Sequence, residues 1–218
     1  MKKPRIALIH ATPVAIDPIC ATFKQLWPQA QVTNLLEDSL SSDLAAAGAI
    51  DEKMVDRFGT LAEYAQNCGA DAVLFTCSAF GIAIEASRGR VRIPVLKPNE
   101  AMLDEALAAG TRIGLLATFE PSIPSIVKEI EELAGARRIE VVTSAVPQAL
   151  AALHAGRAAE HDAMIATAAE RLHGCEVLIL SQFSMASAAA VIPARPGRTV
   201  LTSPHSAVTR LKQLLHAA

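Results

Sequence analysis

Aromatic side chains, excess charge of one sign and long apolar runs are all scarce in this sequence. Phe, Trp and Tyr make up only 4% of the 218 residues, which argues against the aromatic platforms on which single-stranded nucleic acids stack. The formal net charge is −2, so the excess of Lys and Arg that attracts a nucleic acid or an acidic membrane surface is missing. We therefore expect neither kind of partner.

No apolar run is long enough to predict a membrane span. The longest uncharged stretch, residues 177–194, contains serine, glutamine and proline, which favours a buried strand, a turn and the start of a helix. The apolar segment 6–9 is also shorter than the core of a secretory signal, which needs roughly 7–15 residues. With 51% hydrophobic residues the chain is not disordered either, and we expect a compact cytoplasmic protein.

The cysteines and histidines form no recognisable metal-binding pattern. The four cysteines include no CxxC pair, and the six histidines show neither HxH nor HExxH spacing. In a cytoplasmic protein these cysteines are expected to be free thiols. The glycine-rich loops that hold dinucleotides or nucleotide phosphates are absent as well. The sequence therefore predicts no metal and no organic cofactor.

The chain contains two copies of one structural unit. The strand-like run 5–12 recurs at 112–119, an offset of 107, and each copy leads through proline into a helical stretch. A second apolar run, residues 71–78, recurs at 175–182 with an offset of 104. Both copies of this second run end in small polar residues, as buried parallel strands do. The offset of 104 pairs Cys77 with Ser181.

Predicted strands and helices alternate along both copies. Amphipathic helices precede the runs that end at Cys77 and Ser181, and helices 99–109 and 205–216 follow prolines near their starts. This alternation predicts an α/β fold of two similar lobes, each a parallel sheet covered by helices, related by a pseudo-twofold axis.

The repeat also predicts how the chain is shared between the lobes. We expect lobe one to comprise residues 1–98 with 205–218, and lobe two to comprise residues 99–204. Ligands of open parallel sheets bind beyond the carboxyl ends of the strands, so the active site is expected in the cleft between the lobes. The strand ends that would face it are residues 10–13, 76–79, 117–119 and 181–184. They carry one thiol, several hydroxyls and an amide, but no fixed cation and no carboxylate.

Cys77 is the one reactive side chain at these strand ends. A helix that begins beside a thiol can lower its pKa, and the small residues Ser78 and Ala79 leave backbone N–H groups that could receive a carboxylate. The alternative is a buried, inert cysteine, which is common in apolar strands. A histidine could also act on the thiol or on the opposite face of a substrate, and His10 and His205 lie at predicted strand ends.

Three features together resemble the aspartate/glutamate/hydantoin racemase superfamily, which includes maleate isomerase and arylmalonate decarboxylase. They are the paired half-repeats, the segment LFTCSAFG at 74–81 and the segment LLAT at 115–118. The resemblance spans essentially the whole chain. It implies a cofactor-independent enzyme in which one cysteine removes the α-proton of a small carboxylate and a second cysteine returns a proton to the opposite face. Cys77 matches the first cysteine, and Ser181 is expected in place of the second.

The leading interpretation is a racemase or isomerase that acts on a small carboxylate, amino-acid-like or hydantoin-like, by cysteine-based proton transfer. Cys77 and Ser181 are the expected catalytic residues. Because a serine hydroxyl is a far weaker acid than a thiol, proton transfer is expected from the Cys77 side only. The expected substrate-binding residues are Thr12, Ser78, Ala79, Thr118, Phe119, Gln182 and His205.

Two other functions agree with the same residues. One is a one-cysteine decarboxylase of the arylmalonate type, in which the thiol protonates the intermediate left by the departing carboxylate. The other is a non-catalytic protein that binds small acids. The resemblance is also compatible with a homo-oligomer.

Overall fold

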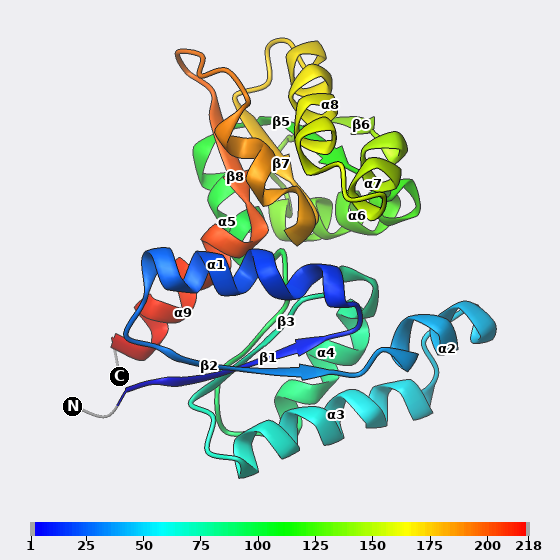
Figure 1. Cartoon of the computed structure of the whole chain (residues 1–218), viewed down its shortest axis with the longest axis vertical. Helices are drawn as coiled ribbons and strands as arrows, with labels where there is room; N and C mark the ends of the chain where they lie inside the picture. Colours follow the sequence, from blue (N-terminus) through cyan, green and yellow to red (C-terminus); the bar gives the residue numbers. More distant parts are fainter. Residues whose placement is uncertain (1–2, 217–218) are drawn as a thin grey trace. The chain divides into compact units, whose positions relative to one another are not determined.

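A computed structural model describes residues 3–216 of the chain (Figure 1). The chain divides into two compact units, Met1–Glu100 with Ala207–Ala218 and Ala101–Ser206. Each unit contains a four-stranded parallel sheet with flanking helices, so the predicted α/β class with two similar lobes is confirmed. No helix within residues 3–216 is both long and apolar enough to cross a membrane.

The first unit is built on a sheet with strand order β2-β1-β3-β4. Its strands are β1 (Arg5–His10), β2 (Gln31–Leu36), β3 (Ala72–Phe75) and β4 (Val95–Leu96). Its helical segments are η1 (Pro13–Ala15), α1 (Ile16–Leu26), α2 (Ser39–Ala47), α3 (Glu52–Asn67), η2 (Ser78–Phe80), α4 (Gly81–Ser87) and η3 (Arg88–Arg90). Figure 1 shows α1 on one side of this sheet and α3 and α4 on the other.

The core under α3 and α4 is the aromatic centre of the first unit. The ring of Phe58 lies 5.0 Å from the ring of Phe75 and 4.9 Å from the ring of Phe80, measured between centroids. The predicted apolar face of α3 supplies Phe58, whereas Cys68 lies just beyond the end of that helix and is exposed. This cluster packs directly beneath the carboxyl ends of β1 and β3 and so supports the segment that carries Cys77.

The second unit repeats the arrangement with strand order β6-β5-β7-β8. Its strands are β5 (Arg112–Ala117), β6 (Glu140–Ala145), β7 (Val177–Leu180) and β8 (Thr199–Thr202). Its helical segments are α5 (Glu100–Ala109), η4 (Glu120–Ser122), α6 (Ile123–Ala134), α7 (Pro147–His154), α8 (Ala158–Arg171) and η5 (Phe183–Ala190). Helix α9 (Ser203–His216) begins in this unit, and its later residues belong to the first, where Lys212 Nζ donates to the carbonyl of Leu26 at 3.2 Å.

Alternate residues of β7 pack into two separate cores. Val177 and Ile179 face the cluster formed with α5 and α6, whereas Leu178 and Leu180 face the cluster formed with α8 and η5. All four residues are fully buried. A strand covered on both faces contains an unbroken apolar run without alternation, which is why this segment is recognisable in the sequence.

The strand registers correct one part of the predicted repeat. Ile6 of β1 pairs with Ala72 of β3, and Ile113 of β5 pairs with Val177 of β7. The offset of 107 therefore holds for β1 and β5, but β3 corresponds to β7 with an offset of 105 rather than 104.

The predicted pairing of Cys77 with Ser181 was therefore wrong. Ser181 corresponds to Thr76, because the backbone N–H of each donates to the neighbouring strand, to Leu116 and Ile9 respectively. Cys77 corresponds to Gln182. A slip of one residue is invisible in two runs that are apolar throughout, since it moves no polar residue into the core.

Candidate active site

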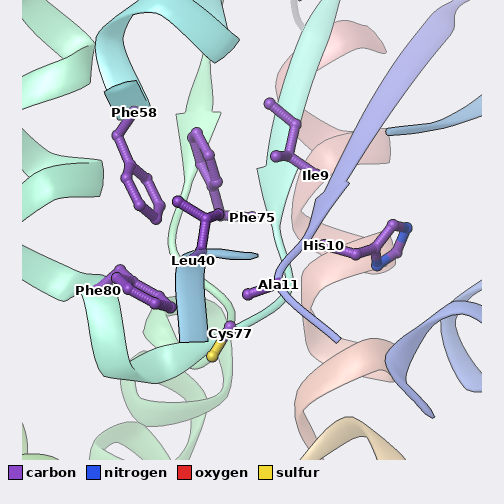
Figure 2. A pocket seen from close by; sticks show the side chains of 8 residues that line it. All are labelled: Ile9, His10, Ala11, Leu40, Phe58, Phe75, Cys77 and Phe80. Carbon is purple, nitrogen blue, oxygen red and sulfur yellow. The ribbon is translucent and has the colours of Figure 1, made fainter. Parts of the chain in front are cut away.

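Cys77 lies at the carboxyl edge of the first sheet, directly after β3. It borders a small, closely packed pocket in which the side chains around the thiol are mainly apolar (Figure 2). The residues that line this pocket are Ile9, His10, Ala11, Leu40, Phe58, Phe75, Cys77 and Phe80. Since β1 and β3 are parallel neighbours, the segments that follow them meet at the same edge.

Two effects of opposite sign act on the Cys77 thiol. Burial raises the pKa of Cys77 above its ordinary value, and a hydrogen bond from the backbone N–H of Ala79 to Sγ lowers it by less. The expected lowering by the start of a helix is thus present but outweighed, because the half-buried thiolate would lose hydration. Cys77 is therefore a protonated thiol at neutral pH, better suited to donate a proton than to remove one.

The predicted binding residues of the first unit follow β1 and β3 at the same edge of the sheet as this thiol. Thr12 follows β1 at the start of η1 and is half-buried, and its hydroxyl makes no capping hydrogen bond. Ser78 and Ala79 directly follow Cys77, Ser78 half-buried and Ala79 exposed. All three are positioned where a ligand beyond the strand ends could reach them.

His10 is not directed at the thiol. Its Nε2 lies 3.0 Å from Asn34 Oδ1, and its Nδ1 lies 2.8 Å from Thr76 Oγ1. Because an amide oxygen only accepts, Nε2 carries the proton and Nδ1 accepts from the threonine hydroxyl. Burial lowers the pKa of His10, although the Asn34 hydrogen bond opposes that shift, so the ring is neutral.

The ring of His10 points away from Phe58, Phe75 and Phe80 in Figure 2. It is completely buried, and it joins β1 to a residue on each neighbouring strand segment. His10 therefore connects the ends of three adjacent strands through hydrogen bonds and fixes the position of Thr76, the residue before Cys77. Asn34, a polar residue within β2, is the feature of the sequence that could have indicated this interaction.

An ion-pair cluster at the same edge was missed by the sequence reasoning, which expected no fixed charges there. The N–H of Glu37 donates to the carbonyl of His10 at 2.9 Å, so the segment after β2 lies beside the end of β1. Arg57 of α3 pairs with Glu37 and Asp43, and hydrogen bonding to Asp43 is the main cause of its raised pKa. Glu37, Asp43 and Arg57 lie on separate segments of the chain, so no local sequence motif indicates that they interact.

Gln182 holds the position in the second unit that Cys77 holds in the first. Each residue precedes the 3-10 segment after the buried third strand of its unit. The side-chain Oε1 of Gln182 accepts from the Thr118 N–H at 2.8 Å and lies 3.3 Å from the Thr118 hydroxyl, while Nε2 donates to Ser122 Oγ at 3.0 Å. An amide neither donates nor removes protons as an acid or base near neutral pH, so this position lacks the second proton-transfer group.

The two hydroxyls expected at this edge are engaged inside the fold. Ser181 is only 2% exposed, and its Oγ donates to the carbonyl of Leu116 at 2.9 Å. Thr118 is 1% exposed and hydrogen-bonded to Gln182. Neither the expected acid/base role of Ser181 nor the expected carboxylate contact of Thr118 agrees with these positions. The other two predicted residues, Phe119 and His205, are exposed.

Comparison with known proteins agrees with the fold described above. A family model described as Asp/Glu/Hydantoin racemase matches residues 21–211. No curated protein shows significant sequence similarity to the chain. Similar solved structures include aspartate racemase from Picrophilus torridus, with a TM-score of 0.73, 14% identity, and coverage of 97% of this chain and 94% of that one.

Two further structures share the fold at similarly low identity. Allantoin racemase from Klebsiella pneumoniae has a TM-score of 0.74 and 17% identity, covering 98% of this chain and 88% of that one. A mutant of arylmalonate decarboxylase in a sulfate-associated form has a TM-score of 0.69 and 17% identity, covering 96% of this chain and 94% of that one.

Proposed function

We propose that this chain, which belongs to the Asp/Glu/hydantoin racemase family, is an enzyme that uses Cys77 as its single thiol to transfer a proton at one face of a small carboxylate. The observation that carries the proposal is the correspondence of Cys77 with Gln182. A thiol in one unit and an amide in the other leave one group able to exchange a proton with carbon.

The protonated state of the thiol favours proton delivery. In the proposed step the S–H bond of Cys77 breaks and a C–H bond forms at the α-carbon of an enediolate-like intermediate. The electron pair of that intermediate is left by the C–H bond when the ionised form of Cys77 removes the α-proton on the same face, or by the C–C bond when carbon dioxide departs. The backbone N–H of Ala79 stays hydrogen-bonded to the sulfur and stabilises the resulting thiolate. Water then returns a proton to the sulfur, which restores the resting thiol.

The substrate carboxylate is proposed to lie against the segments that follow β1 and β3. The candidate donors are the hydroxyls of Ser78, which directly follows Cys77, and of Thr12, which follows the neighbouring strand β1, and both residues are half-buried. Thr118 is omitted from this set because Gln182 occupies its N–H. No step requires a metal or an organic cofactor, so dialysis against a chelator should leave the activity unchanged.

A one-cysteine decarboxylase of the arylmalonate type is the second candidate. It is favoured by the correspondence of Cys77 with Gln182, because loss of carbon dioxide leaves a carbanion that needs one proton donor and no base. A racemase, in contrast, needs a base for the first step. A protein that binds small acids without reacting is the remaining alternative.

Isotope exchange in heavy water distinguishes these functions. The protein is incubated with aspartate, glutamate, allantoin and phenylmalonate, and deuterium at the α-carbon is measured by mass spectrometry together with released carbon dioxide. Exchange without carbon dioxide release indicates a racemase or isomerase, and release with incorporation of one deuteron indicates a decarboxylase. Binding without either would contradict the proposed enzyme.

A further inference from the structure

A second cavity lies at the opposite edge of the second sheet from Gln182. Its volume is about 200 Å³, and it is lined by Leu172, Gly174, Cys175, Glu176, Arg195, Pro196, Gly197 and Arg198. Cys175 and Glu176 precede β7, and Arg198 precedes β8, so these residues lie at the amino ends of parallel strands. The thiol and amide positions described above lie at carboxyl ends, so this cavity is a separate site.

A tight turn places two arginines on the wall of this cavity. The N–H of Arg198 donates to the carbonyl of Arg195 at 3.1 Å, which closes a four-residue turn. Pro196 and Gly197 are its central residues, and Gly197 has a φ of +74°. Proline first and a left-handed glycine second are the residues that a type II turn requires. Both guanidinium groups pair with Glu170, so they lie close to each other.

The guanidinium of Arg198 has a donor without an acceptor. The side chain is only 5% exposed, its Nη2 donates to the carbonyl of Pro193 at 2.6 Å, and Nη2 lies 3.4 Å from Glu170 Oε1. Its Nε is buried and has no hydrogen-bond partner among residues 3–216. A buried donor left without an acceptor carries a desolvation cost, so an acceptor is expected there.

Arg112, the first residue of β5, lies beside this region without lining the cavity, and its Nη2 pairs with Glu140 Oε1 at 3.3 Å. Its Nη1 packs over Gly174, where a Cβ would lie only 3.2 Å away, and its charge, like that of Arg198, acts on Cys175. The Nε of Arg112 is also buried without a partner among the described residues.

The only carboxylate that lines the cavity is already engaged. Glu176 Oε2 accepts from the N–H of Thr111 at 2.6 Å, from its hydroxyl at 3.2 Å and from the N–H of Arg112 at 3.0 Å. Glu170 pairs with Arg195 and Arg198 but does not line the cavity. Of the two arginines in the lining, Arg198 keeps one donor, Nε, without an acceptor among residues 3–216.

We infer that this cavity binds a small oxyanion that carries at least two anionic oxygens, either a phosphate group or a dicarboxylate. Guanidinium groups match such oxygens through paired N–H donors, which a single point charge would not. The volume is below the usual range of ligand pockets, about 300–1,000 Å³, so the ligand is small. Glu170 competes with the anion for both turn arginines.

Titration calorimetry on the full chain tests this inference, with inorganic phosphate and succinate as probes at fixed ionic strength. For at least one probe we expect a site whose affinity depends on Arg195 and Arg198. Arg198→Gln and Arg195→Gln should each weaken binding by about tenfold or more, since each removes a charged hydrogen-bond donor. Glu170→Gln should tighten binding, because it releases both guanidinium groups from their internal partner. Arg138→Gln, an exposed arginine of the same unit, is the matched control and should change nothing.

The outcomes separate the possible sources of the anion and the two sites. Saturable binding of phosphate alone indicates a phosphorylated ligand, and binding of succinate alone indicates a carboxylate. Cys77→Ala should bind the probe as the wild type does, so failure of the proposed enzyme would leave this result intact. If Arg198→Gln does not fold, the exposed Arg195→Gln decides. No saturable binding, or equal affinity in both arginine variants, overturns the inference and indicates an adventitious ion only.

Discussion

At the scale of single residues, the loss of hydration on burial determines the protonation state of Cys77. The backbone N–H of Ala79 favours the thiolate, but burial favours the thiol by more. The residue is consequently an acid with its proton in place at neutral pH. This favours donation of the proton, whereas a base would need the opposite balance.

Replacement of Cys77 by alanine should remove proton transfer. Loss of a positioned acid typically costs about 100-fold or more in rate. Deuterium incorporation into the substrate is the measurement, with Cys68→Ala as the control because Cys68 is exposed at the end of α3. Undiminished incorporation in Cys77→Ala would refute the mechanism.

The raised pKa of Cys77 also predicts a pH dependence of its alkylation. Iodoacetamide reacts with the thiolate, so the reaction at Cys77 should be slow at pH 7, rise with pH and level off only above the ordinary thiol pKa of about 8.5, because burial disfavours ionisation. Peptide mass spectrometry measures the rate at each cysteine. A rate at Cys77 that is already maximal at pH 7 would show that the backbone hydrogen bond outweighs burial.

His10 should make the protein less stable in mild acid. Its pKa is lowered in the folded state, so below the ordinary value of 6.5 the unfolded chain binds more protons than the folded one. The free energy of unfolding should therefore fall from pH 7 to pH 5. Urea denaturation of His10→Gln should show a smaller fall over this range, while His154→Gln, an exposed histidine, should keep the wild-type slope. Equal slopes in all three proteins would contradict this assignment.

At the scale of secondary-structure elements, the pairing register of β7 decides which side chain reaches the edge of the sheet. Ser181 is still held by the sheet, through its N–H and its hydroxyl to Leu116. Gln182 is the first residue beyond that constraint, as Cys77 is in the first unit. A change of one residue in the register of β7 thus decides whether the residue beyond the sheet is Ser181, whose hydroxyl is bound inside the fold, or Gln182, which is partly accessible.

Substitution of Gln182 by cysteine should create proton exchange at the second face. The new thiol has an ordinary pKa of about 8.5, within reach of neutral pH, whereas the amide it replaces has no exchangeable acid function. Deuterium incorporation measured separately in each enantiomer of the substrate provides the readout. Ser181→Cys is the matched control, and because its side chain is directed at Leu116 it should add no second-face exchange. More second-face exchange in Ser181→Cys than in Gln182→Cys would support the offset of 104, which pairs Cys77 with Ser181.

At the scale of the whole molecule, each unit has its own core. The aromatic cluster of Phe58, Phe75 and Phe80 serves the first sheet, and two aliphatic clusters serve the second. The chain leaves the first unit after Glu100 and returns to it at Ala207. The two sheets are therefore stabilised by different sets of side chains.

Truncation of Phe58 to alanine should loosen the first unit more than the second. Removal of a buried phenylalanine costs about 3–5 kcal/mol in free energy of unfolding, through lost burial and the cavity left behind. Hydrogen exchange should accelerate most at the amides of β1 and β3, with a smaller effect in β5 and β7. Equal acceleration in both sheets would mean that the units unfold only together.

The sequence by itself determined the parts of this protein that depend on local pattern. Unbroken apolar runs predict buried parallel strands, their repetition predicts two similar units, and the small residues after the strand at 72–75 mark Cys77 as a strand-end thiol. These features are visible because each depends on neighbours in the chain. The same locality explains why the resemblance to a family was carried by short segments around the strand ends.

Only the tertiary structure decided the features that depend on contacts between distant residues. The register of β7 shows that Gln182, and not Ser181, corresponds to Cys77. The hydrogen bonds to Leu116 determine which residue is the first beyond the sheet, and the apolar pattern does not contain that information. His10 proved to be a neutral tie between strands, since its partners Asn34 and Thr76 lie 24 and 66 residues away. Hydrogen-bond partners and burial determine the pKa of a side chain and whether a substrate can reach it. Neither the partners nor the burial can be read from the spacing of residues along the chain.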